Sequence, residues 1–186
     1  MQDLHASIDL ETLGTNVDNQ ILSIGVCLFD LNSYTVQQTF YYKVEVPLYK
    51  SISTTKGTIQ FWINQAINNP DSLKGLFTTD EEKTISMESA LTELADVITS
   101  NNVRNVWANS PKFDLAMLEH QYKIYDIRVP WQFSDDRCMR TLRFLAHELF
   151  YTPVNVDFEG TYHNAMDDAI WQSHYIMNVI KKLREK

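Results

Sequence analysis

The sequence predicts an α/β fold in which a mixed central β-sheet is flanked by α-helices. Two observations support this. Stretches with the apolar alternation and β-branched content of strands fill the first part of the chain, and after them helical periods alternate with a short apolar run. We expect residues 1–186 to form a single domain, since there is no repeat, low-complexity tract or Pro/Gly-rich linker.

Three strands are predicted at the start, over residues 4–10, 20–30 and 35–46. Short turns rich in Gly, Asn and Asp separate them. Three consecutive strands at such spacing predict an antiparallel meander.

Helices dominate the rest of the chain. From Ser86, a predicted N-cap, the apolar positions through Ile98 fall on one helical face. Residues 104–108 follow as a short buried strand. Further helices are predicted over residues 111–125, 136–149 and 165–183.

Composition limits the classes of function. The apolar fraction of 44% is ordinary and no apolar run approaches the ~20 residues that a membrane span needs, so we expect no membrane association. The N-terminus lacks the pattern of a secretory signal, and the two cysteines, Cys27 and Cys138, form no C-x-x-C pair. We expect a cytoplasmic protein with both thiols reduced and structural.

The net charge of −8 at first argues against a nucleic-acid partner, because phosphate binding usually requires a basic surface. A metal-dependent nuclease resolves this conflict. Clustered carboxylates make the chain acidic, and divalent cations supply positive charge where the phosphate lies.

Asp9 and Glu11 lie at the end of the first predicted strand, where residues i and i+2 point to the same face. The D-x-E pattern alone is weak, since it recurs at residues 80–82 and 157–159, usually as a solvated charged segment. Only the first copy ends an apolar strand and precedes a turn. Strand ends are where α/β sheets tend to place ligands.

Asp114 follows the strand of residues 104–108, where the chain passes into a helix. Its simplest interpretation is a first-turn carboxylate favoured by the helix dipole. Phe113 is either a core aromatic or a base-stacking one.

His163 and Asp168 open the last predicted helix. A histidine five residues before a carboxylate at a helix start can bring both to one metal site, and the alternative is an acidic first turn beside a surface histidine. The remaining histidines match no ligand spacing and are interpreted as structural: His5, His120, His147 and His174.

Taken together, the motifs D-L-E-T at residues 9–12, F-D at 113–114 and H-x-x-x-D-D-A at 163–169 resemble the three exonuclease motifs of the DEDDh family. That family belongs to the ribonuclease H-like superfamily and degrades nucleic acid from the 3′ end. The segment 58–65 is also similar to a Trp-containing stretch of phage exonuclease A and of the RNase AS-type exoribonucleases.

The resemblance implies that four carboxylates bind two Mg²⁺ or Mn²⁺ ions and that His163 is the general base. The four are Asp9, Glu11, Asp114 and Asp168. The family spacing selects Asp168, so Asp167 is assigned to the helix start. All five family positions are intact, which argues against a catalytically dead relative.

Other residues are considered for contacts with the substrate. Leu13 and Trp62 are candidates to pack against the terminal base or sugar, with a core role equally open for Trp62. Arg137, Arg140 and Arg143 share part of a predicted helix face, and we favour a solvated stripe over phosphate contacts. Relatives often carry an acid at the position of Cys138, which puts any site role there in doubt.

The predicted substrate is the 3′ end of single-stranded RNA or DNA, with RNA slightly favoured, and relatives with the Trp segment suggest a homodimer. Three alternatives stay open. They are an exodeoxyribonuclease of the phage exonuclease A type, a non-catalytic ribonuclease H-like binding module, and an unrelated hydrolase that uses two carboxylates without a metal.

Overall fold

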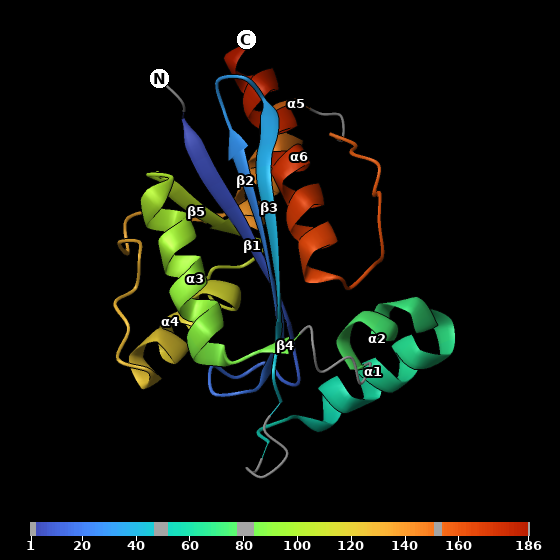
Figure 1. Cartoon of the computed structure of the whole chain (residues 1–186). Coiled ribbons are helices and arrows are strands. Elements are labelled where there is room, and N and C mark those ends of the chain that lie inside the picture. Colours follow the sequence, from blue (N-terminus) through green and yellow to red (C-terminus); the bar gives the residue numbers. More distant parts are fainter. Residues whose placement is uncertain (1–2, 47–51, 78–83, 151–153, 186) are drawn as a thin grey trace.

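The computed structural model describes residues 3–46, 52–77, 84–150 and 154–185. Within these residues six strands form one mixed sheet in the order β4-β3-β2-β1-β5-β6 (Figure 1). The strands are β1 (Leu4–Thr12), β2 (Ile21–Asp30), β3 (Thr35–Val44), β4 (Thr84–Ile85), β5 (Asn105–Ala108) and β6 (Asp136–Cys138). The α/β class with a mixed sheet is therefore confirmed.

The first three strands form the predicted antiparallel meander. β5 then pairs in parallel with β1, and β6 in parallel with β5. β1 thus lies inside the sheet between β2 and β5, and apolar and polar side chains alternate along it. Ala6, Ile8 and Leu10 enter one core, whereas the polar Ser7, Asp9 and Glu11 all face the other side.

Six helices accompany the sheet: α1 (Lys56–Asn68), α2 (Pro70–Phe77), α3 (Met87–Ser100), α4 (Asp114–Ile124), α5 (Met139–Phe150) and α6 (Ala165–Arg184). α3 and α4 cover one face of the sheet, and α5 and α6 cover the other (Figure 1). Because α6 lies against the polar residues of β1, a candidate active site is to be sought on that face of the sheet.

Two predicted helices start later than expected, and two further helices were not predicted. The helix predicted over residues 136–149 starts only at Met139, because residues 136–138 pair with β5 as strand β6. The helix predicted over 111–125 begins at Asp114, after a turn. Helices α1 and α2 were not predicted, although Thr55 caps α1 by accepting a hydrogen bond from the Thr58 amide.

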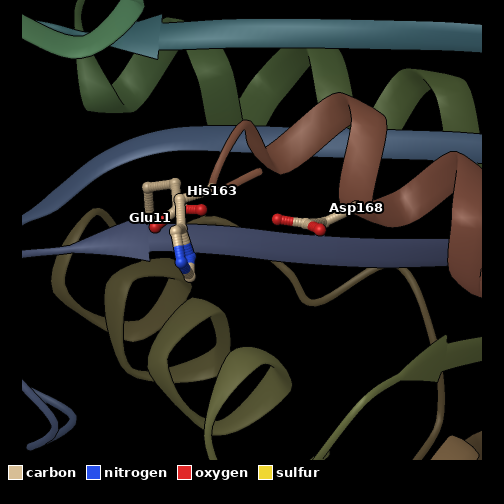
Figure 2. Close-up of side chains that lie close together, drawn as sticks. All are labelled: Glu11, His163 and Asp168. Atoms are coloured by element: carbon tan, nitrogen blue, oxygen red, sulfur yellow. The ribbon is translucent and has the colours of Figure 1, made fainter. Parts of the chain in front are cut away.

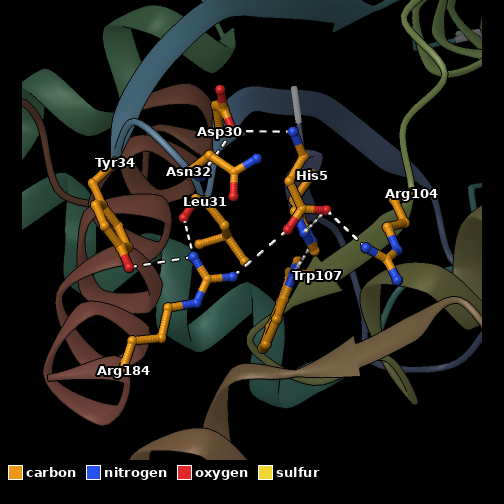
Figure 3. A network of polar contacts seen from close by, with 9 residues as sticks. His5, Asp30, Leu31, Asn32, Tyr34, Arg104, Trp107 and Arg184 are labelled. Carbon is orange, nitrogen blue, oxygen red and sulfur yellow. Dashed lines mark hydrogen bonds and ion pairs between the residues drawn. The ribbon is translucent and has the colours of Figure 1, made fainter. Parts of the chain in front are cut away.

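The end of the sheet opposite the carboxylates is closed by a polar network that joins the N-terminal segment to the last helix (Figure 3). Asp3 Oδ1 accepts a hydrogen bond from Arg104 at 3.2 Å, and Asp3 Oδ2 lies 3.7 Å from Arg184 Nη2. Arg184 also donates to the Leu31 carbonyl and to the Tyr34 hydroxyl. No helix in the described ranges is long and apolar enough to cross a bilayer.

Candidate active site

Two of the predicted carboxylates stand on the same face of β1. The strand runs to Thr12, two residues beyond the predicted end, so that Asp9 and Glu11 both belong to it. Glu11 is buried, with 7% of its surface exposed. Asp114, 3% exposed, approaches from the first residue of α4, and its Oδ2 accepts a long hydrogen bond of 3.4 Å from the Ser110 amide.

The start of α6 supplies the other two side chains. His163 has a φ of 62°, in the left-handed region, and Asn164 then caps the helix by accepting from the amides of Met166 and Asp167. The Asp167 carboxylate turns back to accept from the Thr161 amide at 2.8 Å. Asp167 thus lies at the helix start, where it was predicted, and Asp168 is left to face the sheet.

A glycine lets this helix start come close to the sheet. Gly25 of β2 pairs with Asp9, and a Cβ built on Gly25 would lie 2.0 Å from the carbonyl carbon and oxygen of Ala165. Any side chain here would collide with backbone atoms of α6. The absence of a Cβ therefore allows the first turn of α6 to rest beside the carboxylates of β1.

The result is a compact group of three side chains from opposite ends of the sequence. Glu11, His163 and Asp168 each offer one potential ligand atom, and these atoms all lie within 4.8 Å of one another (Figure 2). Asp9 and Asp114 lie outside this tight group. The charge of Asp114 nevertheless acts on this group, because it adds to burial and to the charge of Asp168 in raising the pKa of Glu11. The group in turn acts on Asp9, whose pKa is raised by burial and then by the charges of Asp114, Glu11 and Asp168.

The electrostatics of the group favour a bound cation. Burial, followed by the charges of Asp168 and Asp114, raises the pKa of Glu11 to about 8. Burial also raises the pKa of Asp114 to about 7 and that of Asp168 to about 6, and it holds the pKa of Asp9 well above its ordinary value. Carboxylates buried together repel one another, and a divalent cation removes that repulsion.

The donor set fits a hard divalent metal. Carboxylate oxygens are the ligands that Mg²⁺ and Mn²⁺ prefer. Burial lowers the pKa of His163 below its ordinary value of 6.5, which favours the neutral imidazole that can accept a proton.

Two further residues that the sequence analysis missed hold Asp9 in place. Gln172 Nε2 donates to Asp9 Oδ1 at 2.8 Å, and Ser7 Oγ donates to Gln172 Oε1 at 3.3 Å. Both are buried. The signal was present in the spacing, because Gln172 follows Asp168 by one helical turn and Ser7 precedes Asp9 by one strand repeat.

A cavity of about 420 Å³ opens beside Glu11 between β1 and α1. Of the predicted substrate contacts, Trp62 and Phe113 line this cavity. Trp62 is 6% exposed, and its Nε1 donates to the Thr12 carbonyl at 2.9 Å, so it also has a structural role. Leu13 packs against the small apolar cluster around Trp62 and is not among the residues that line the cavity.

Phe61 is a cavity residue that the sequence analysis did not single out. It is 37% exposed, and its ring meets the His163 ring edge to face with the centroids 4.9 Å apart. An exposed aromatic beside the candidate base can stack on a nucleotide. Its neighbour Trp62 was predicted instead, as part of the segment 58–65 that resembles the Trp-containing stretch of related exonucleases.

The predicted arginine stripe does not exist as one helix face. Arg137 lies in β6 and donates to the carbonyls of Ser134 and Asp136, while Arg140 and Arg143 are exposed on α5. Burial raises the pKa of Asp114, and Arg140 is near enough for its charge to offset a part of that rise.

Both cysteines are free thiols. Cys27 is buried in β2, and burial raises its pKa to about 11. The Cys138 thiol donates to the Asn109 carbonyl at 3.7 Å.

Solved structures define the class of fold. The nuclease domain of 3′hExo, a DEDDh family member bound to rAMP, matches with a TM-score of 0.66 and 14% identity, covering 97% of this chain and 93% of that one. Cell-death related nuclease 4 matches with a TM-score of 0.68 and 14% identity over 97% of this chain. E. coli exonuclease I in complex with an oligonucleotide matches with a TM-score of 0.69 and 13% identity over all of this chain. The fold is ribonuclease H-like, as predicted.

The chain spans 64% of the length of cell-death related nuclease 4 and 42% of that of exonuclease I. No curated protein sequence matches the chain significantly.

The family follows from the sequence as a whole. The model of the 3′-5′ exoribonuclease Rv2179c-like domain matches residues 4–180, nearly the entire chain. The chain belongs to this family and is a 3′-5′ exonuclease.

Proposed function

We propose that residues 1–186 form a single DEDDh exonuclease domain that removes 5′-mononucleotides from the 3′ end of single-stranded nucleic acid, RNA in preference to DNA. The observation that carries the proposal is the meeting of Glu11, His163 and Asp168 from opposite ends of the chain, beside a cavity lined by aromatic side chains. Such a cavity can accept the terminal base of a strand. The carboxylates beside the cavity would then lie next to the phosphate that joins this last nucleotide to the rest of the strand.

In the proposed mechanism, two Mg²⁺ or Mn²⁺ ions would be held by the carboxylates of Asp9, Glu11, Asp114 and Asp168. The chemistry that such ions would supply is polarisation of the scissile phosphate and stabilisation of the leaving oxygen. His163 accepts a proton from the attacking water at an imidazole nitrogen, the water oxygen bonds to phosphorus, and the bond from phosphorus to the 3′ oxygen breaks. A 5′-mononucleotide leaves, and the 3′ oxygen of the shortened strand takes a proton from solvent water to become a hydroxyl.

Gln172 keeps Asp9 oriented during this reaction through its 2.8 Å hydrogen bond. Phe61, Trp62 and Phe113 form the walls against which the terminal nucleotide packs, with Leu13 supporting Trp62 from the side. Four threonines also line the cavity: Thr12, Thr15, Thr55 and Thr58.

The preference for RNA rests on the family description as an exoribonuclease domain and on the rAMP bound by 3′hExo. The match with exonuclease I bound to an oligonucleotide keeps a DNA exonuclease as the second candidate. Recognition of the 2′-hydroxyl decides between them. We further propose a cytoplasmic enzyme, in keeping with two free thiols.

A homodimer is part of the same proposal. Helix α1 carries Ile59, Ile63 and Ile67 at successive turns, with exposed fractions of 45%, 55% and 72%. Its only charged residue is Lys56. A stripe of exposed isoleucines on such a helix is suited to burial against a second copy, and sedimentation equilibrium of the parent and an Ile63→Glu, Ile67→Glu variant would test this.

The function is tested with 5′-labelled single-stranded RNA and DNA of one sequence, in Mg²⁺, Mn²⁺ or EDTA. We expect a ladder that shortens from the 3′ end, faster on RNA, and no cleavage in EDTA or with Asp168→Asn. His163→Ala should lower turnover about 100- to 10,000-fold, as removal of a general base does. His174→Ala, which changes an exposed histidine further along α6, is the matched control and should keep full activity.

Faster shortening of DNA would favour the second candidate. Intact substrate in every metal would leave a non-catalytic binding module. Cleavage that persists in EDTA would point to a hydrolase that needs no metal.

A further inference from the structure

Two hydroxyl side chains that the proposed mechanism does not use stand next to the carboxylates. In the register of the sheet, Glu11 pairs with Ser23, and Gly25, the partner of Asp9, pairs in turn with Tyr41 of β3. Residues that pair directly across antiparallel strands point to the same face. Ser23 and Tyr41 therefore share the face of Asp9 and Glu11, and Ser23 and Tyr41 are diagonal neighbours, within reach for a long aromatic side chain.

Both hydroxyl oxygens are buried, and among the described residues neither has a hydrogen-bond partner other than the second hydroxyl of the pair. Two hydroxyls that bond to each other still leave one proton without an acceptor. Ser23 as a whole is 0% exposed. Buried polar atoms are almost always hydrogen-bonded, and an unpaired one calls for a group that completes it in the working state of the protein. A hydroxyl needs an acceptor, and an ionised carboxylate is the strongest acceptor that a protein offers.

The charges around Tyr41 identify the acceptor. Burial raises the pKa of Tyr41, a hydrogen bond with the Ser23 side chain opposes this rise, and the charges of Glu11 and Asp167 add to it. Asp167 already accepts a hydrogen bond from the Thr161 amide. Glu11 is also the acceptor that we expect for Ser23, since the two residues are paired in the sheet.

We propose that Tyr41 and Ser23 are positioning residues that hold the Glu11 carboxylate, directly or through one buried water, when a divalent cation binds. This inference rests on the proposed metal-binding role of Glu11. A carboxylate that binds a metal through one oxygen leaves lone pairs free, and donors behind it fix its orientation. The two hydroxyls, fixed by β2 and β3, are placed to be such donors.

The experiment measures Mn²⁺ binding to the whole chain without substrate, by calorimetry or by the electron paramagnetic resonance of free Mn²⁺. Tyr41→Phe removes only the hydroxyl. We expect its dissociation constant for Mn²⁺ to rise about 10- to 100-fold, the range found when a partner of a metal ligand is removed. Nuclease activity at low Mn²⁺ should fall in parallel and recover at saturating Mn²⁺, which a merely structural defect would not do.

The matched control is Tyr42→Phe. Tyr42 is the next residue of the same strand, but it faces the opposite core, away from the carboxylates. Its variant should bind Mn²⁺ within twofold of the parent. Ser23→Ala should weaken binding and Ser23→Thr, which keeps a hydroxyl, should largely restore it, so the inference can still be tested if Tyr41→Phe fails to fold.

Mn²⁺ affinity within twofold of the parent in both Tyr41→Phe and Ser23→Ala would overturn the inference and leave the proposed function intact. Failure of the parent itself to bind Mn²⁺ would instead overturn the proposed metal site, and the role of the two hydroxyls with it.

Discussion

His5 shows how one buried residue ties stability to pH. It is 5% exposed in β1, it stacks on Phe29, and its Nδ1 accepts a hydrogen bond of 3.0 Å from Trp107 Nε1. Its Nε2 lies 3.4 Å from Asp3 Oδ1. Burial lowers the pKa of His5 below the ordinary 6.5, although Asp3 acts in the opposite direction. The folded protein therefore favours neutral His5.

The lowered pKa of His5 makes the stability of the fold depend on pH. Because the folded pKa lies below the unfolded value of 6.5, the contribution of His5 to stability is complete above that value and declines as pH falls below it. His5→Gln keeps an acceptor for Trp107 but cannot ionise. We expect the difference in unfolding free energy between parent and variant to shrink between pH 7.5 and 5.5, measured by urea denaturation in EDTA. A constant difference across this range would contradict the assignment.

At the scale of elements, the contact between β2 and α6 positions two residues of the candidate site, His163 and Asp168. At Gly25 the sheet and the first turn of the helix approach closely, and the atoms in the way of a side chain belong to the backbone of Ala165 and Met166. Backbone atoms cannot rotate aside as a flexible side chain can. The position of His163 and Asp168 over β1 thus depends on one missing methyl group.

Gly25→Ala should destabilise the fold by about 1 to 3 kcal/mol or more, because it forces a methyl group into a closed contact. Metal-dependent cleavage should fall as well, since the start of α6 must shift. Gly57→Ala is the matched control in thermal unfolding. A Cβ there meets nothing within 4 Å, so we expect no loss, and a gain of about 0.5 to 1 kcal/mol from the less flexible unfolded chain. Equal melting temperatures for the two variants would refute the tight contact.

At the scale of the whole molecule, the concentration of buried negative charge couples folding to metal. A chain of net charge −8 gathers carboxylates of Asp9, Glu11, Asp114 and Asp168 close enough for their charges to act on one another. This repulsion exists in the folded state only. A cation that binds the folded state alone stabilises it by mass action.

We therefore expect Mn²⁺ to raise the melting temperature and EDTA to abolish the effect. At 100 times the dissociation constant the gain is about 2.7 kcal/mol, roughly 5 to 10 °C for a chain of this size. Asp168→Asn should lose most of the gain. Asp157→Asn, in an exposed copy of the D-x-E pattern, should keep it in full, and an equal loss in both variants would argue against a specific site.

The sequence by itself determined the fold class and the family, because both are indicated by local sequence patterns. The period-2 strands predict the meander, Ser86 marks the start of α3, and the three motifs carry the resemblance to DEDDh exonucleases that the family match confirms. It misjudged residues 136–138, since Asp136, Arg137 and Cys138 have no strand-like pattern and become β6 only by pairing with β5.

Only the tertiary structure decided which side chains meet. The support of Asp9 by Gln172, the packing of Phe61 on His163 and the burial of the Ser23 and Tyr41 hydroxyls join residues far apart in the chain. Such contacts depend on strand register and on how closely α6 packs on the sheet. A local sequence pattern records the face on which a residue lies, but not its partner across the core.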